Sequence, residues 1–267
     1  GLTEIVLPDG LISIGDAAFS HCDRLSRIHI PDSVTFIGEM AFSFCSGLTE
    51  IRLPDHITSV ADLMFSSCKN LEQVRIPDGV TSVGRRAFLN CVKLKSVNLP
   101  DSVTSIQAEA FMGCDRLESV VIPDSVTSLG EGAFSLCKNL ACVTLPDRLT
   151  DIGARAFAGC GHLKKLRIFG LAIDGSRCEW EKDHPSEMLH MLRDRDYDVP
   201  LSLRTKYEFA VRQYEEDREA EAEKWIRKNA LRILKQFVKA DDYEALRRLL
   251  GSGILLPGKA VASALDC

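Results

Sequence analysis

A repeat of 23 residues runs through the first two thirds of the chain and constrains its fold more than any other feature. Leucine, phenylalanine, cysteine and a Pro-Asp pair each return at this interval without an insertion or deletion. Such a period is typical of a solenoid, in which each copy buries its apolar face only by stacking on its neighbours. The repeated leucines and cysteines are Leu2, Leu25, Leu48, Leu71, Leu94, Leu117, Leu140, Leu163, Cys22, Cys45, Cys68, Cys91, Cys114, Cys137 and Cys160.

A short strand is predicted at the start of each copy. In the second copy, polar and apolar residues alternate up to Ile30, so that Ile28 and Ile30 would face the core. Pro31 has no amide hydrogen to donate to a sheet and would end this strand. A glycine follows in most copies, and we expect it to occupy a tight corner with a positive φ angle. These glycines are Gly15, Gly38, Gly84, Gly130 and Gly153.

The complete copy reads Leu-x-x-Ile-x-Ile/Leu-Pro-Asp, followed by two apolar positions, Gly, Ala-Phe and Cys. Over residues 2–168 this pattern resembles the BspA-type leucine-rich repeat. The resemblance implies an α/β repeat fold, a right-handed leucine-rich-repeat solenoid with one short parallel strand per copy. It also implies a binding or adhesion module without catalysis. Members of this family are bacterial and protist proteins, many of them exported or surface-exposed.

Two columns of residues that bind metals in other proteins would run along such a solenoid. Stacked copies lie roughly 4.8 Å apart, so the repeated cysteines form one column and the Pro-Asp carboxylates form another. A straight column of thiols does not converge on a tetrahedral zinc site. Calcium sites draw several oxygens from each turn, whereas one carboxylate recurs per copy. We therefore predict that both columns are structural.

The outward side chains of the strands are the predicted partner-binding face, because the strand face of a solenoid is an extended binding surface. Three arginines and a histidine form a basic patch over three copies, with one glutamate inside it, which suggests an acidic partner. A solvated sheet face with local charge pairing is the alternative. The candidate residues are Arg27, His29, Glu50, Arg52, Gln73, Arg75, Asn98, Lys165 and Arg167.

The repeat fails at Phe169 and Gly170, where the next Pro-Asp pair should stand. We divide the chain into a solenoid of seven full copies and a terminal strand (1–169), a junction that seals the last copy (170–184), and a helical domain (185–267). An open-ended solenoid requires such a seal at its end. We expect the helical domain to be truncated.

Helical spacing and capping residues predict the C-terminal helices. Pro185 would open a first helix that ends near Arg195. The Asp-Asp pair at 241–242 would cap a later helix that ends at Gly251. Residues 240–267 bear a weak resemblance to an ankyrin-like helix pair, which implies apolar surface that packs on further helices.

Composition and motifs argue against several functional classes. The net charge of −5 lacks the basic excess that nucleic-acid binding needs, and no apolar run approaches the roughly 20 residues of a membrane span. The run from Gly253 to Ala260 matches most of a P-loop, but Ala260 stands where Ser or Thr would bind Mg²⁺. Cys178, His184 and His190 lack the spacing of a zinc site. We expect no catalytic residue, no cofactor and no metal.

The sequence therefore favours a non-enzymatic protein–protein interaction module that binds its partner on the strand face. The alternative is an enzyme or regulated effector whose activity resides in the helical region or in segments absent from this chain. The chain starts and stops within its patterns, so we expect it to be a fragment. A cell-surface or secreted adhesin and a cytoplasmic scaffold both fit, and the many free cysteines agree with the second setting.

Overall fold

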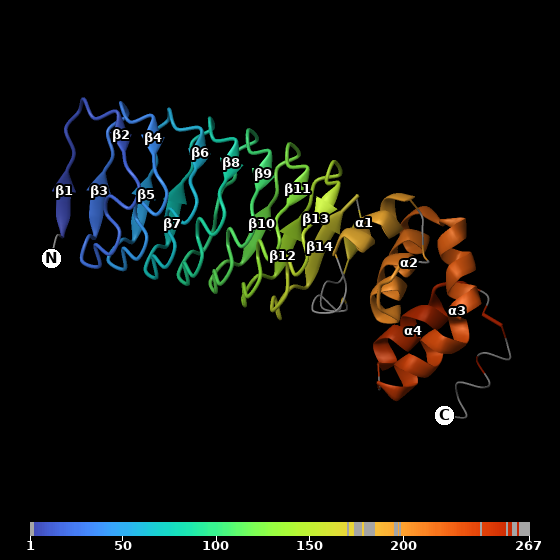
Figure 1. The fold of residues 1–267 in the computed structure, drawn as a ribbon. Coiled ribbons are helices and arrows are strands. Elements are labelled where there is room, and N and C mark those ends of the chain that lie inside the picture. The colour runs from blue at the N-terminus through green and yellow to red at the C-terminus, as the bar shows by residue number, and fades with distance from the viewer. Residues whose placement is uncertain are drawn as a thin grey trace.

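The computed structural model of the chain shows a solenoid of about seven turns followed by a group of four helices (Figure 1). The structure describes residues 3–169, 171–173, 178, 185–194, 197, 199–240, 242–254, 256–257 and 261. The solenoid extends from the N-terminus, and the helices lie beyond its last turn. The predicted order of a repeat solenoid and an all-α C-terminal region is confirmed.

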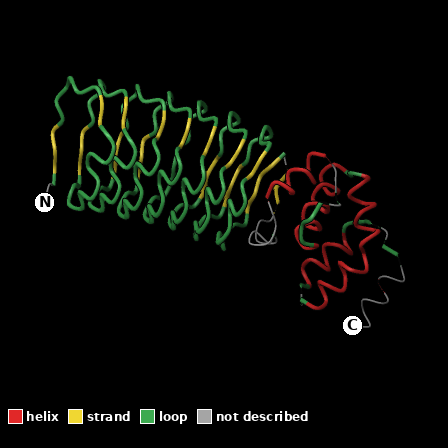
Figure 2. The backbone as a smooth tube through the Cα atoms, in the orientation of Figure 1, coloured by secondary structure: helices red, strands yellow, loops and turns green. Residues whose placement is uncertain are grey.

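The predicted strands lie next to one another along the solenoid (Figure 2). Each begins two residues after the repeated leucine, because the alternation of polar and apolar residues starts there. Paired strands are parallel, and the register places Glu4 opposite Arg27 and Ile5 opposite Ile28. These strands are β1 (Glu4–Val6), β3 (Arg27–His29), β5 (Glu50–Arg52), β7 (Gln73–Arg75), β10 (Ser119–Val121), β12 (Cys142–Thr144) and β14 (Lys165–Ile168).

A second strand in each of seven copies was not predicted. It covers two residues, of which the first is exposed or half-buried and the second is a buried Ile, Val or Leu. Two residues are too few to show an alternating pattern, so the sequence does not reveal this strand. These strands are β2 (Ser13–Ile14), β4 (Phe36–Ile37), β6 (Ser59–Val60), β8 (Ser82–Val83), β9 (Ser105–Ile106), β11 (Ser128–Leu129) and β13 (Asp151–Ile152).

The fifth copy interrupts the first ladder of strands. Ser96 and Asn98 are predicted on a strand, yet no strand is assigned over 96–98. The flanking hydrogen bonds between copies are long, at 3.3 Å from the Lys95 amide to the Glu72 carbonyl oxygen and 3.4 Å from the Glu118 amide to the Lys95 carbonyl oxygen. The prediction of a strand in every copy is wrong for the fifth copy, because the residue pattern does not reveal the lengths of the hydrogen bonds between copies.

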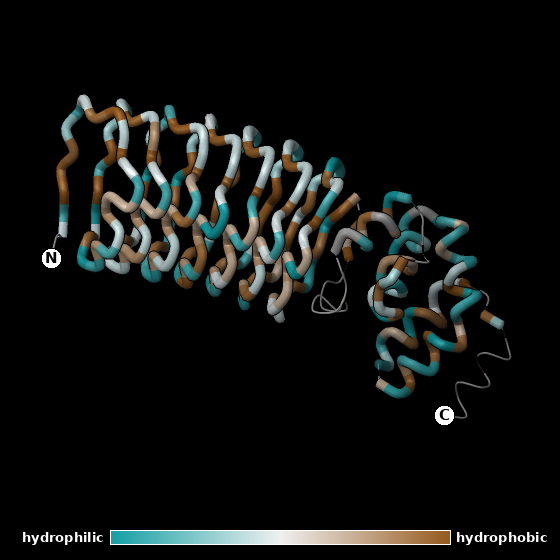
Figure 3. The backbone as a smooth tube through the Cα atoms, viewed as in Figure 1, coloured by the Kyte–Doolittle hydropathy of each residue, from teal (hydrophilic) through white to brown (hydrophobic). Residues whose placement is uncertain are grey.

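One apolar core runs the length of the solenoid and continues into the helices. Figure 3 shows hydrophobic segments that recur from turn to turn. The repeated phenylalanines stack face to face, with ring centroids 5.1 to 5.9 Å apart. Each inner ring thus contacts a ring on both sides, and the column forms a continuous aromatic core. The stacked rings belong to Phe19, Phe42, Phe65, Phe88, Phe111, Phe134 and Phe157.

The repeated glycine is needed for a different reason from the one predicted. None of the five repeated glycines has a positive φ, which occurs two residues later, as at Met40 and Arg86. At Gly130, an added Cβ would lie 2.3 Å from the amide nitrogen of Ala108 in the preceding turn. The prediction of a left-handed corner is therefore wrong. At Gly38, Gly84, Gly130 and Gly153 the preceding turn approaches too closely for a side chain, whereas Gly15 has open space and Ala61 and Gln107 occupy this position in two other copies.

The solenoid ends in a strand that reverses direction. β15 (Leu171–Ile173) pairs antiparallel with β14, with Ala172 opposite Arg167. β15 occupies the position that the next copy would take. It pairs with the open edge of β14, as the end of an open solenoid requires. Residues 174–177 and 179–184 of the predicted junction lie outside the described residues.

Four helices follow the solenoid. They are α1 (Pro185–Asp194), α2 (Leu203–Asp217), α3 (Ala220–Lys239) and α4 (Tyr243–Gly251). The predicted start of α1 and end of α4 are confirmed, and Asp242 caps α4 by accepting the Ala245 amide at 3.0 Å. At the end of the solenoid, α1 contacts β13 and α2 contacts β15, while α3 contacts α2 and α4. None of the described helices is long and apolar enough to cross a membrane.

Candidate partner-binding surface

All nine candidate residues are exposed, and eight of them lie on strands. Alternation explains their direction: Ile51 is buried, whereas Glu50 and Arg52 on either side of it are exposed. Six candidates lie together on the second to fourth copies. Asn98 lies on the fifth copy, and Lys165 and Arg167 lie on β14.

A groove of about 490 Å³ lies over the strands of the first four copies. Glu4 and Val6 extend it onto β1, although neither was a candidate. Alternation places them on the outward face too, because they stand at the same strand positions as Arg27 and His29. All six clustered candidates line the groove: Arg27, His29, Glu50, Arg52, Gln73 and Arg75.

The basic patch in this groove is partly neutralised. The Arg52 guanidinium lies 3.3 Å from a carboxylate oxygen of Asp55 and 3.9 Å from one of Asp32. Arg27 and Arg75 form no ion pair with any described residue. Two arginines of the patch are therefore available to an incoming carboxylate, and the third already has partners within the chain.

Lys165 and Arg167 line a separate hollow of about 350 Å³ near the end of the solenoid. Lys164, which precedes β14, and Arg212, on α2, also line it. Neither residue was a candidate from the sequence. Arg212 follows the repeat by more than 40 positions, and no local pattern places it next to β14.

The cysteine column is held by hydrogen bonds to the preceding copy. Each buried thiol from Cys45 to Cys160 donates to a phenylalanine carbonyl oxygen at 3.0 to 3.3 Å, as Cys68 does to Phe42. Burial raises the pKa of the Cys45 thiol to about 12 and raises the pKa of the inner thiols as well. Thiolate, the form that binds metals and attacks electrophiles, is therefore scarce in this column at neutral pH.

Metal ligands do not converge in the part of the chain that the structure describes. No group of three His, Cys, Asp or Glu side chains there could hold an ion. Cys178 is buried, while His184 and the side chain of His190 lie outside the described residues. The Gly-Lys-Ala run at 258–260 of the P-loop-like segment also lies outside them.

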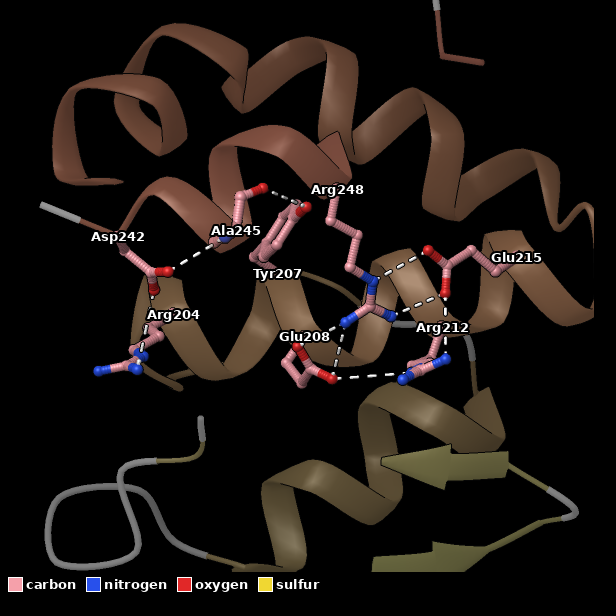
Figure 4. Close-up of polar contacts among 8 residues, drawn as sticks. All are labelled: Arg204, Tyr207, Glu208, Arg212, Glu215, Asp242, Ala245 and Arg248. Carbon is pink, nitrogen blue, oxygen red and sulfur yellow. Dashed lines mark hydrogen bonds and ion pairs between the residues drawn. The ribbon is translucent and has the colours of Figure 1, made fainter. Parts of the chain in front are cut away.

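Charged side chains gather between α2 and α4, where Arg248 joins two glutamates (Figure 4). Its guanidinium donates to both carboxylate oxygens of Glu208, at 3.0 and 3.1 Å, and to both of Glu215, at 2.7 and 2.9 Å. The Glu208 side chain is 1% exposed. Arg212 lies 3.3 Å from Glu215 and 3.8 Å from Glu208. Two arginines and two glutamates thus neutralise one another, which is an arrangement that holds helices together.

This network makes the helical region sensitive to acid. Burial would raise the pKa of Glu215, but the hydrogen bonds and charge of Arg248 outweigh it, and the net pKa is lowered. Such a carboxylate stabilises the fold above its unfolded pKa, about 4.3, and that contribution is lost as pH falls through the folded pKa. We expect the melting temperature to decrease below about pH 4.3, measured by circular dichroism at 222 nm. The Glu215→Gln variant should show a smaller decrease, and a decrease as steep as wild type would contradict this role.

Comparison with known proteins agrees with the repeat pattern. The profile of the BspA type leucine rich repeat region matches in 6 copies, over residues 1–118 and 104–173. A leucine rich cell surface protein from Faecalibacterium prausnitzii A2-165 is similar, with 25% identity and a TM-score of 0.47 over 63% of this chain and 60% of that one. A leucine-rich repeat protein of T. pallidum has 27% identity and a TM-score of 0.47 over 73% of this chain and 84% of that one.

The chain spans less than two thirds of the length of the Faecalibacterium protein. No curated protein matches it. The repeat profile matches more than half of the chain, and the matched residues include every strand of the solenoid. The chain therefore belongs to the BspA-type leucine-rich repeat family.

Proposed function

We propose that this protein is a non-enzymatic binding module whose groove over the first four copies binds an acidic segment of a protein partner. Proteins of this repeat family are typically protein–protein interaction modules. The observation that carries the proposal is the groove itself. It is lined by exposed strand residues and contains two arginines, Arg27 and Arg75, that pair with no described residue.

The groove suits an extended acidic segment on physical grounds. An arginine presents a planar fork of donors that binds a carboxylate through two parallel hydrogen bonds. Arg27 and Arg75 lie two copies apart and are offset by two residues along the strand, so their Cα atoms are roughly 12 Å apart at the spacings of parallel strands. Two carboxylates on one side of an extended peptide lie roughly 6.6 Å apart, or roughly 13 Å at every fourth residue. A flexible acidic segment therefore reaches both arginines without disturbing the scaffold.

Acidic residues in the groove limit which partners fit. Glu4 lies opposite Arg27 in the strand register, and Glu50 lies on the next strand and lines the same groove. A uniformly acidic partner would be repelled at these two positions. Charge pairs at an exposed surface steer association and define specificity more than they add affinity. We therefore expect a partner whose acidic residues alternate with neutral or basic ones.

The test compares two triple variants with the same change in charge. Arg27, Arg52 and Arg75 are replaced by alanine in one variant, and Arg24, Arg85 and Arg148, which are exposed outside the groove, in the other. The wild-type chain is the bait for partners from a lysate of the source organism and from host-surface extracts, read by mass spectrometry. Dissociation constants are then measured for each recovered partner by isothermal titration calorimetry.

The expected result is a partner whose affinity falls at least tenfold, about 1.4 kcal/mol, in the groove variant and stays within about twofold, about 0.4 kcal/mol, in the control. Circular dichroism should show the same helix and sheet content in all three proteins, since the replaced side chains are exposed. Equal affinities of the groove variant and wild type would show that the partner binds elsewhere. Equal losses in both variants would indicate a general effect of charge and would contradict the groove as the site.

A further inference from the structure

The hollow at the junction of solenoid and helices is built from three elements that the chain brings together from distant positions. Lys165, Leu166 and Arg167 come from β14, Ala172 and Ile173 from β15, and Arg212 from α2. Lys164, just before β14, completes its lining. The volume is about 350 Å³. Four of the seven lining residues are cations, and none is an acid.

Three of these cations form no ion pair with a described residue, although Glu118 lines a neighbouring hollow together with Lys164. Lys164, Lys165 and Arg167 are exposed and form no ion pair with any residue that the structure describes. The strand register explains why, because Lys165 lies opposite Cys142, and Arg167 lies between Thr144 and Ala172. These neighbours are uncharged. In the groove at the other end of the solenoid, by contrast, Arg27 lies opposite Glu4.

The fourth cation belongs to the network between α2 and α4 and adds an unsatisfied donor. Arg212 shares Glu208 and Glu215 with Arg248, so these two acids are balanced by two arginines and leave no charge for the hollow. The Nε–H group of Arg212 is buried and lies 3.8 Å from a carboxylate oxygen of Glu208, which is too far for a hydrogen bond.

We propose that this hollow is a binding site for a small phosphorylated ligand, whose phosphoryl oxygens pair with Lys164, Lys165 and Arg167 and approach the guanidinium of Arg212. Three uncompensated positive charges within one site favour a ligand with more than one negative charge. A phosphoryl group has a charge of about −1.5 to −2 at neutral pH and three acceptor oxygens, whereas a carboxylate has a single charge. The site lies at the opposite end of the solenoid from the groove, so it does not rest on the proposed protein partner.

The probe for this site is inorganic pyrophosphate, titrated into the whole chain by isothermal titration calorimetry at low ionic strength. The site variant is the double replacement Lys165→Gln and Arg167→Gln. The matched control is Arg24→Gln and Arg85→Gln, which removes the same charge from exposed positions that line neither this hollow nor the groove. All four side chains are exposed, and unchanged circular dichroism would show that both variants fold.

We expect one saturable site in the wild-type chain, an affinity at least tenfold lower in the site variant, and a change of less than about twofold, about 0.4 kcal/mol, in the control. Affinity should fall as salt is raised, because the contacts are ionic. Absence of saturable binding up to about 10 mM pyrophosphate, weaker than about −3 kcal/mol, would overturn the proposal. Equal weakening in both variants would overturn it too, since that is the behaviour of diffuse charge attraction. Binding of citrate as tightly as pyrophosphate would overturn the assignment to a phosphoryl group.

Discussion

Replacement of Phe111 by alanine is expected to lower the free energy of unfolding by about 3–5 kcal/mol. The ring is fully buried and stacks between Phe88 and Phe134, with centroid distances of 5.1 and 5.2 Å. Truncation removes buried apolar area and also leaves a cavity. The copies on either side are joined by backbone hydrogen bonds, such as that from the Phe111 amide to the Ala133 carbonyl oxygen at 2.8 Å. They cannot collapse freely into the space, so the cost should be near the upper end of the range.

Urea unfolding followed by circular dichroism measures this effect, and Phe36→Ala is its control. Phe36 is 56% exposed on β4 and lies outside the stacked column. Its truncation should change the free energy of unfolding by less than about 0.5 kcal/mol. If both variants lost the same free energy, the stacked column would not be the source of the stability assigned to it.

Replacement of Gly130 by alanine is expected to lower the free energy of unfolding by about 3 kcal/mol, because the added methyl group would overlap backbone atoms of the preceding turn. The added Cβ would lie 2.3 Å from the amide nitrogen of Ala108 and 2.4 Å from the carbonyl carbon of Gln107. These atoms belong to the backbone of the preceding turn, so they cannot rotate away as a flexible side chain would. The two turns must separate to admit the methyl group, which weakens the hydrogen bond from the Gly130 amide to Ile106, now 2.8 Å long.

The first copy supplies the control for this prediction. Gly15 stands at the same repeat position, and a Cβ added there would meet nothing within 4 Å. Its φ angle is not positive, so alanine is tolerated by the backbone. Gly15→Ala should leave the stability unchanged or raise it by about 0.4–1 kcal/mol, since alanine lowers the entropy of the unfolded chain. The urea midpoints of the two variants should move in opposite directions or differ widely. A small effect at Gly130 would show that neighbouring turns separate easily.

The sequence predicted which side chains of the candidate surface point outward, but it did not predict which of them form ion pairs. Period-two alternation within each strand, combined with the spacing between copies, placed Arg27, Arg52 and Arg75 on one face. It did not predict that Arg52 would turn towards Asp55 and Asp32. The rotamer of a long side chain depends on its neighbours from several turns of the solenoid. The sequence of one strand therefore does not predict that rotamer.

The hollow near the helices was even less predictable from the sequence than the ion pairs of Arg52. Lys165 and Arg167 were candidates because they face outward from a strand, yet their site depends on Arg212, which comes from a helix of the next region. The docking of α2 on β15 brings these residues together. No periodicity relates a repeat to the helices that follow it, so only the packed structure could show that four cations share one hollow.

The sequence by itself determined the solenoid, the position and direction of its outward strands, the columns of Phe and Cys, and the bounds of α1 and α4. These features depend on residue spacing and on capping residues such as Asp242, which act over a few positions or repeat at each turn. The tertiary structure decided the reason for the repeated glycine, the second strand of each copy and the gap in the fifth. It also decided the ion pairs of Arg52 and the hollow around Arg212. Each of these depends on distances between turns or between regions, and such distances arise only when the chain packs against itself.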